Sequence, residues 1–166
     1  MPAPLSRAHR RFLLVDEVIG SSIVNFLLNG AMAWWVFRKA TSVPLWGSSS
    51  IAVDTLVTSF VLPLLTALIA TPIVRAQVAW RKLPLLPKAE LRSSVWTRRT
   101  VVMRGALLGV AAVVLVGAPV VLFFSLVGPH QLPTTSFILF KAGFAAALGA
   151  VVTPLLGWWA LLDASR

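Results

Sequence analysis

The sequence of 166 residues contains no Cys, no Tyr and only two His. Without Cys the chain can form neither a disulfide nor a thiolate metal site, and it has no Cys nucleophile. His9 and His130 lie far apart in the sequence, so they form no histidine cluster with the spacing of metal ligands. We therefore expect neither a metal nor another cofactor.

Charge is also scarce, since only 12% of the residues are charged whereas 58% are hydrophobic. An ordinary soluble domain has about 25% charged residues. The mean hydropathy of +0.87 indicates an integral membrane protein. The sequence also has no phosphate-binding Gly loop, nucleophile elbow or metalloprotease helix, so we expect no catalytic residues and no enzyme activity.

Four apolar runs are long enough to cross a bilayer, which takes about 20 helical residues. They cover residues 12–37, 51–74, 105–127 and 137–162. The predicted fold is all-α, a four-helix membrane bundle that forms a single domain over residues 1–166.

Basic residues are distributed unevenly among the predicted loops. Most of the 15 Lys and Arg residues lie in the N-terminal tail and in the loop of residues 75–104. The other side of the membrane receives only Arg38, Lys39 and Lys141. Because the side richer in Lys and Arg stays in the cytoplasm, both termini are predicted to be cytoplasmic in a bacterial inner membrane. The net charge of +10 is then mainly a topology signal.

The basic loop has two interpretations. Residues 88–100 could form a short helix on the inner leaflet, where each basic residue near anionic headgroups contributes about 1 kcal/mol. They could instead be a solvated connector that only enforces topology. In the first case the headgroup contacts would come from Arg81, Lys82, Lys88, Arg92, Arg98 and Arg99. Membrane attachment explains these charges, so we expect no nucleic-acid partner.

Polar residues form stripes on the first two predicted spans. Ser22, Asn25 and Asn29 share one helical face, and so do Thr55, Ser59 and Thr66. Because lipid cannot satisfy an amide, a polar face should meet other helices or a wet cavity. We predict that the two stripes face each other, either as interhelical hydrogen bonds or as a polar substrate pathway.

Small residues four apart mark the other two spans. Gly105 and Gly109 form one such pair, and Gly143 and Ala147 form another. Small residues allow helix backbones to approach closely in lipid. The pattern fits contacts within one chain as well as contacts between copies in a homo-oligomer.

Two ionisable residues lie inside spans at similar depth. Asp54 is about one turn into the second span, and Lys141 is about one turn into the fourth. Charges within spans usually face a partner or water, which predicts an Asp54–Lys141 ion pair. The alternative is that Lys141 extends to the headgroups, while Asp54 is stabilised by the helix dipole in the first turn of its helix.

Asp16 and Glu17 lie at the start of the first span. They could form an interfacial salt-bridge cluster with Arg104 or Arg75. Alternatively, Glu17 could be a desolvated carboxylate that couples proton movement to transport.

Two resemblances bear on function. The ten residues from Glu17 to Phe26 resemble the first helix of the small multidrug resistance transporters, which implies that Glu17 would bind protons and drugs. Most of the chain resembles small four-span bacterial inner-membrane proteins that are labelled permease-like. This broader resemblance rests on segments 25–30 and 43–47, on Asp54, and on Phe140-Lys141 followed by segment 152–155.

These observations predict a small permease-like or accessory subunit without catalytic chemistry. Its partners would be anionic lipid headgroups and either further copies or a larger membrane complex. The alternative is a proton-coupled exporter of small molecules or cations that uses Glu17 and the Asn25/Asn29 stripe.

Overall fold

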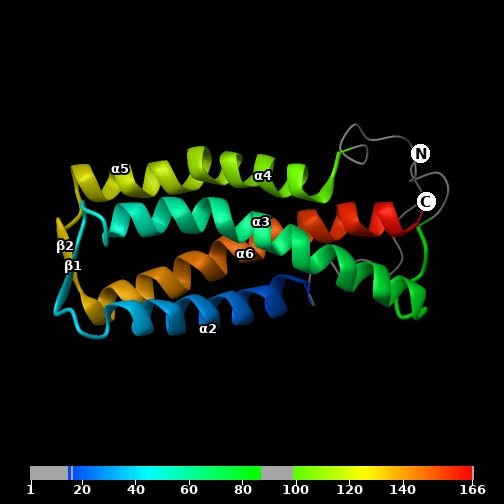
Figure 1. Ribbon diagram of the computed structural model, residues 1–166, viewed down its shortest axis with the longest axis horizontal. Coiled ribbons are helices and arrows are strands. Elements are labelled where there is room, and N and C mark those ends of the chain that lie inside the picture. Colours follow the sequence, from blue (N-terminus) through cyan, green and yellow to red (C-terminus); the bar gives the residue numbers. More distant parts are fainter. Residues whose placement is uncertain (1–14, 16, 87–98, 166) are drawn as a thin grey trace.

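The computed structural model describes residues 15, 17–86 and 99–165. Among these residues, four helical spans are long and apolar enough to cross a membrane. They lie side by side with alternating direction (Figure 1). The prediction of an all-α, four-helix membrane bundle is confirmed. The spans are α2 (Glu17–Phe37), α3 (Ile51–Ala79), the α4–α5 span (Val101–Leu126) and α6 (Thr134–Ala164).

The helices differ in length and in where they end. At 1.5 Å per residue, α2 is about 31 Å long, whereas α3 and α6 are about 43 and 46 Å long. The predicted loop of residues 75–104 is therefore too long, because α3 continues to Ala79 and α4 (Val101–Ala112) begins before Gly105. The Thr100 hydroxyl caps α4 by accepting a hydrogen bond from the Met103 N–H (3.3 Å). Residues 87–98 lie outside the described part of the chain, and they include most of segment 88–100, which could be a short helix on the inner leaflet or a solvated connector.

A π-helical turn, η4 (Val113–Gly117), joins α4 to α5 (Ala118–Leu126). Pro119 follows this turn at the start of α5 and lacks the N–H that would continue the α-helical ladder. A π turn is a known way to accommodate such an interruption within a continuous helix. The third span thus crosses as one rod despite its proline.

A two-stranded β-ribbon closes one end of the bundle, and the sequence analysis missed it. β1 (Ser42–Pro44) pairs antiparallel with β2 (Gln131–Pro133), with Val43 opposite Leu132. Below the ribbon, the rings of Phe37 and Phe137 meet edge to face at 4.9 Å. We call this end the ribbon end. Its buried apolar residues are Ala33, Phe37, Val43, Leu45, Ile51 and Phe137.

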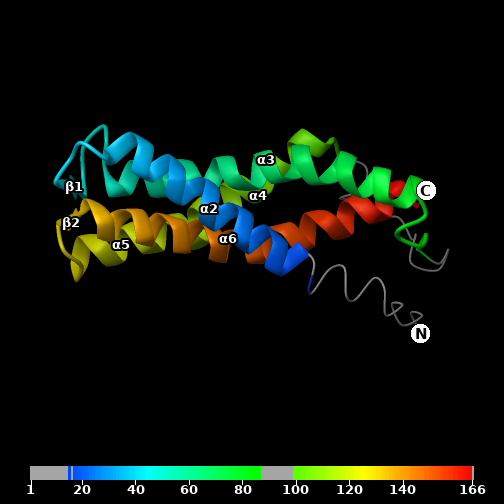
Figure 2. The same ribbon diagram turned by 90° about the horizontal axis from the view of Figure 1, so that it is seen from below.

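The two halves of the chain repeat one arrangement. Helix α2 packs along α6, and the α4–α5 span packs along α3, so the first span of each half contacts the second span of the other. The second spans, α3 and α6, pack against each other between α2 and the α4–α5 span (Figure 1), and α2 crosses in front of them in the view of Figure 2. With β1 paired to β2, the bundle has an approximate two-fold relation between its halves.

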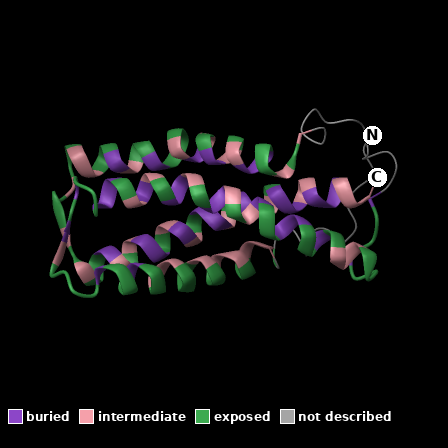
Figure 3. Ribbon diagram, viewed as in Figure 1, coloured by how far each residue is buried: buried purple, intermediate pink, exposed green. Residues whose placement is uncertain are grey.

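Burial follows this arrangement. The central helices α3 and α6 contain most of the buried residues, whereas α2 and the α4–α5 span expose most of their surface (Figure 3). The exposed residues of α2 are apolar, including Ile23, Leu27 and Trp35. Such a surface suits lipid rather than water.

Candidate functional site

The polar face of α2 does not meet the polar face of α3. The Ser22 hydroxyl lies 3.4 Å from the Ala146 carbonyl oxygen of α6, and the Ser21 hydroxyl lies 3.3 Å from that of Gly149. The prediction that the two stripes face each other is therefore wrong. The reason is steric: Ala146 and Gly149 leave the α6 backbone accessible, so α2 can approach it closely. Both hydroxyls also lie within hydrogen-bond distance of the Val18 carbonyl oxygen of their own helix, Ser21 at 3.2 Å and Ser22 at 2.7 Å.

Each of the two amides of α2 donates a hydrogen bond to the backbone of its own helix. Asn25 Nδ2 donates to the Ser21 carbonyl oxygen (2.9 Å), and Asn29 Nδ2 donates to that of Asn25 (3.0 Å). A Cβ atom added to Gly149 would clash with Asn25 Nδ2, which shows how closely α6 covers this amide. At Gly149 the stripe forms a packed helix contact, and both amides are only partly buried.

The polar residues of α3 point into the bundle. Thr55 and Ser59 are almost fully buried, and Thr66 is half-buried. The Ser59 hydroxyl donates to the Thr55 carbonyl oxygen (2.8 Å), and it lies where a side chain on Gly117 would have to fit. The Thr55 hydroxyl itself has no hydrogen-bond partner among the described residues. At Ser59 this stripe therefore contacts the third span, whereas the prediction from the sequence was a contact with the first span.

Asp54 and Lys141 form an ion pair between α3 and α6. Lys141 Nζ donates to Asp54 Oδ1, and both side chains are less than one-fifth exposed. Asp54 also lies in the first turn of α3, after the Ser50 cap, where the helix dipole favours a carboxylate. The pair therefore contains both features that the sequence analysis treated as alternatives for Asp54, while Lys141 is buried and does not extend outward.

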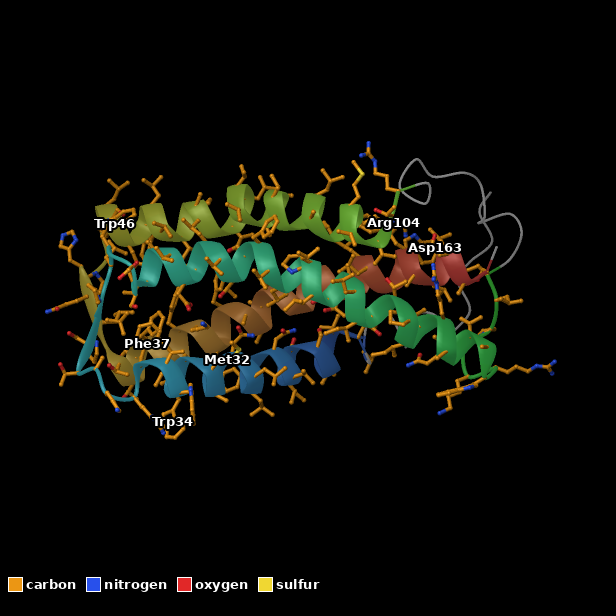
Figure 4. The ribbon with its side chains drawn as sticks, in the orientation of Figure 1. Met32, Trp34, Phe37, Trp46, Arg104 and Asp163 are labelled. Carbon is orange, nitrogen blue, oxygen red and sulfur yellow. The ribbon has the colours of Figure 1, made fainter. Side chains whose placement is uncertain are left out.

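A second ion pair lies at the opposite end, which we call the basic end. Arg104 donates two hydrogen bonds to the Asp163 carboxylate, from Nη1 to Oδ2 (2.7 Å) and from Nη2 to Oδ1 (3.1 Å), and joins α4 to α6 (Figure 4). Arg104 Nε donates to the Arg99 carbonyl oxygen (3.0 Å). Arg75 Nη2 lies 3.9 Å from the same carboxylate and is more than half exposed.

Asp163 was not among the site residues predicted from the sequence. One interpretation of the sequence was that Asp16 and Glu17 could reach Arg104 or Arg75. The carboxylate that lies between these two arginines is that of Asp163, in the last turns of α6. Asp16 lies outside the described residues, and Glu17 is half-buried at the start of α2.

Three of the predicted headgroup residues can be placed. Arg81 and Lys82 are exposed just after α3, with Lys82 Nζ 5.4 Å from the centre of the Trp80 ring. Arg99 is half-buried before α4. The loop begins in a fixed position, because Leu83 and Leu86 are buried beside the end of α6 and the Leu86 N–H donates to the Ser165 hydroxyl (3.0 Å). Lys88, Arg92 and Arg98 lie outside the described residues.

Within residues 15, 17–86 and 99–165, no group of three His, Asp or Glu side chains has the geometry of a metal site. No protein-family model matches the sequence, and no curated protein or solved structure matches it either. The candidate site therefore consists of the two ion pairs and the packed polar face of α2.

Proposed function

We propose that this protein is a small permease-like or accessory subunit of a membrane complex, and that it acts as a helical scaffold without catalytic chemistry. The observation that carries the proposal is that the Asn25 amide is bonded within α2 and packed against α6. Gly149 covers this amide, so at this point α2 meets α6 without an intervening path. A scaffold needs such packing, whereas a substrate path needs polar groups that can exchange partners.

The ion pairs support the same proposal. Lys141 and Arg104 each bond a carboxylate of the chain itself, and each pair ties a different helix to α6. Paired charges hold helices together but leave less capacity to bind a charged substrate.

The expected location is a bacterial inner membrane, with both termini and the basic end in the cytoplasm. The positive-inside rule supports this orientation. The chain has no Cys, so a single introduced Cys can be labelled without background. Ser48→Cys at the ribbon end should react with a membrane-impermeant maleimide in intact cells, whereas Lys82→Cys should react only after the cells are broken. The reverse result would contradict the orientation.

Association with other subunits tests the scaffold role. The tagged chain, extracted from its own host in a mild detergent, should migrate as a complex of fixed composition larger than its 17.9 kDa mass. A tagged four-span protein of unrelated sequence, extracted in parallel, controls for nonspecific capture. Recovery of a lone monomer that binds nothing would contradict the proposal.

The alternative function is a proton-coupled exporter. It is favoured by the position of Glu17, which is half-buried one helical turn before Ser21 and Ser22 on the polar face of α2. An exporter requires cation binding that changes with pH and that is lost in Glu17→Gln. The scaffold role predicts no binding of the test cation tetraphenylphosphonium in either form of the purified protein.

A further inference from the structure

The exposed face of α2 near the ribbon end contains a shallow hollow of about 370 Å³. It lies on the side of α2 away from α6, and Trp34 projects outward there, whereas Phe37 points into the bundle (Figure 4). The lining is almost wholly apolar and comes from Leu28, Ala31, Met32, Trp34, Trp35 and Val36.

A cation lies on the same aromatic rings that line this hollow. The Arg38 guanidinium carbon is 4.4 Å from the centre of the Trp35 ring and 5.4 Å from that of Trp34. Lys39 follows it, and both basic residues are exposed. The ion pairs between described residues use neither of them. Two positive charges therefore adjoin an apolar hollow without a carboxylate bonded to them in the described part of the chain.

The length of this surface matches one leaflet of a bilayer. Leu28 and Arg38 are ten residues apart on a helix that continues to Phe37, which corresponds to about 15 Å. The hydrocarbon core of a bilayer is about 30 Å thick, so one leaflet is about 15 Å. With Arg38 at the level of the headgroups, Leu28 lies near the midplane.

We propose that this face of α2 is a binding site for one phospholipid with a net negative headgroup. The phosphate would contact Arg38 and Lys39, and one acyl chain would lie along the hollow beside Trp35 and Met32. Charge complementarity and the match in length favour a lipid over a second copy of the chain. A second copy would bring another Arg38 and Lys39 toward this pair across a two-fold axis, where like charges repel.

The test uses a phosphatidylglycerol that carries a photoreactive diazirine in one acyl chain. The full-length protein is placed in phosphatidylcholine nanodiscs with a trace of this probe, irradiated and mapped by peptide mass spectrometry. The yield per residue on segment 28–36 is divided by the yield per residue on segment 114–116, which is also exposed and apolar. A bound lipid raises this ratio well above one.

Two variants identify the contacts. Arg38→Gln should lower the ratio about fivefold, because a basic residue at anionic headgroups contributes roughly that factor in affinity. Ala31→Phe should lower it by filling the hollow without changing any charge. Lys82→Gln is the matched control, since it removes another exposed cation that lies over a Trp ring, at the opposite end, and should leave the ratio unchanged. Circular dichroism and thermal unfolding verify that each variant is folded.

Any one of several results would overturn the site. One is a ratio near one in the unaltered protein, which means bulk lipid only. Another is an unchanged ratio in the Arg38→Gln protein. Because Arg38 is exposed, this variant should fold normally, and an unchanged ratio would mean that Arg38 does not bind the lipid. The third is full competition by soluble glycerol 3-phosphate, which would assign the cations to free phosphate. In a separate experiment with a bifunctional crosslinker and no lipid probe, protein–protein crosslinks at segment 28–36 would instead assign the face to a second copy. A probe with a phosphatidylcholine headgroup should give a lower ratio, and an equal ratio would contradict the preference for negative charge.

Discussion

The two ion pairs of this bundle use different chemistry at its two ends. At the ribbon end, Lys141 makes one contact with Asp54 and connects the two central helices. At the basic end, Arg104 makes two contacts with Asp163 and connects a peripheral helix to α6. A lysine ammonium is a compact point charge, whereas the arginine fork matches a carboxylate in two places.

The comparison shows that α6 is the common partner. It supplies the cation of one pair and the carboxylate of the other, and it also packs along α2.

The two pairs also differ in whether a second cation lies near the carboxylate. Asp163 has another arginine, Arg75, at 3.9 Å, whereas the only cation within salt-bridge distance of Asp54 among the described residues is Lys141. Loss of a cation should therefore matter more at the ribbon end.

The largest effect is expected for Lys141→Leu. It leaves the Asp54 carboxylate partly buried without a counter-charge, which costs about 3–5 kcal/mol of folding free energy when a buried pair is broken from one side. The measurement is reversible unfolding of the purified protein in mixed micelles of increasing SDS content.

The double variant Asp54→Leu/Lys141→Leu is the control. A buried ion pair replaced by apolar residues of similar volume is often neutral or stabilising, so most of the lost stability should return. If the double variant is as unstable as Lys141→Leu, the two charges do not act as a pair.

A smaller loss, about 2–3 kcal/mol, is expected for Arg104→Leu. Arg104 is as buried as Lys141, but Arg75 remains near Asp163 and can compensate part of its charge. Arg104→Lys keeps the charge but loses the two-point contact with Asp163 and the Nε hydrogen bond to the Arg99 carbonyl oxygen. Its stability should therefore lie between that of the unaltered protein and that of Arg104→Leu. The same SDS titration ranks the three proteins. A loss for Arg104→Leu that exceeds the loss for Lys141→Leu would reverse the comparison.

The sequence could reveal one of these pairs but not the other. Asp54 and Lys141 interrupt long apolar runs, where any charge is conspicuous and needs a partner. Arg104 and Asp163 lie at the ends of such runs, where charged residues are common. There Arg104 indicates topology, and a carboxylate does not by itself predict a partner. A useful signal was available: Asp163 is the only acidic residue in the sequence after Glu90.

Helix existence was also predictable, whereas helix pairing was not. The length of an apolar run determines that a span exists, but the choice of α6 over α3 as the partner of α2 depends on Ala146 and Gly149 being accessible on one face. The β-ribbon was missed because its three-residue strands contain Pro44 and Pro133, which disfavour a strand when read alone. In a two-stranded ribbon both strands are edge strands, and an edge strand tolerates a proline because one of its sides has no neighbouring strand to receive an N–H hydrogen bond.

The two-fold relation was only hinted at in the sequence. Buried positions of α3 recur in α6 at a constant spacing, as for Ala52 and Ala142 or Ser59 and Gly149. In this register Asp54 corresponds to Phe144. The ribbon-end ion pair therefore breaks the symmetry of the fold. The burial patterns of α3 and α6 match, but their residue types differ, so the repeat is not visible in the sequence.

Substitution of glycines tests whether close packing against α3, in addition to the Arg104–Asp163 pair, holds α4 in the bundle. A Cβ atom on Gly109 would lie 2.7 Å from the Phe60 backbone oxygen of α3, so Gly109→Ala should push the helices apart and cost about 1–3 kcal/mol. Gly143→Ala is the matched control, because a Cβ atom there has no neighbour within 4 Å. It should be neutral, or slightly stabilising since Ala favours helix over Gly.

Both alanine variants are compared with the unaltered protein in the SDS titration, and crosslinking reports their oligomeric state. Equal stability of the two variants would mean that the close α3–α4 approach contributes nothing, and the Arg104–Asp163 pair would then be the main attachment of α4. A loss of oligomers confined to Gly143→Ala would assign that open face to contacts between copies.

The smallest effect is expected for Arg75→Gln. Arg75 is more than half exposed and lies at the limit of a salt-bridge distance from Asp163, so its removal should change stability by at most about 1 kcal/mol. In Arg104→Leu, however, Arg75 becomes the nearest described cation to the carboxylate. Arg104→Leu/Arg75→Gln should therefore lose more stability than the two single changes combined. Strict additivity would show that Arg75 gives Asp163 no reserve, and the greater sensitivity of the ribbon end would then have to come from the depth of Asp54 and Lys141 in the membrane.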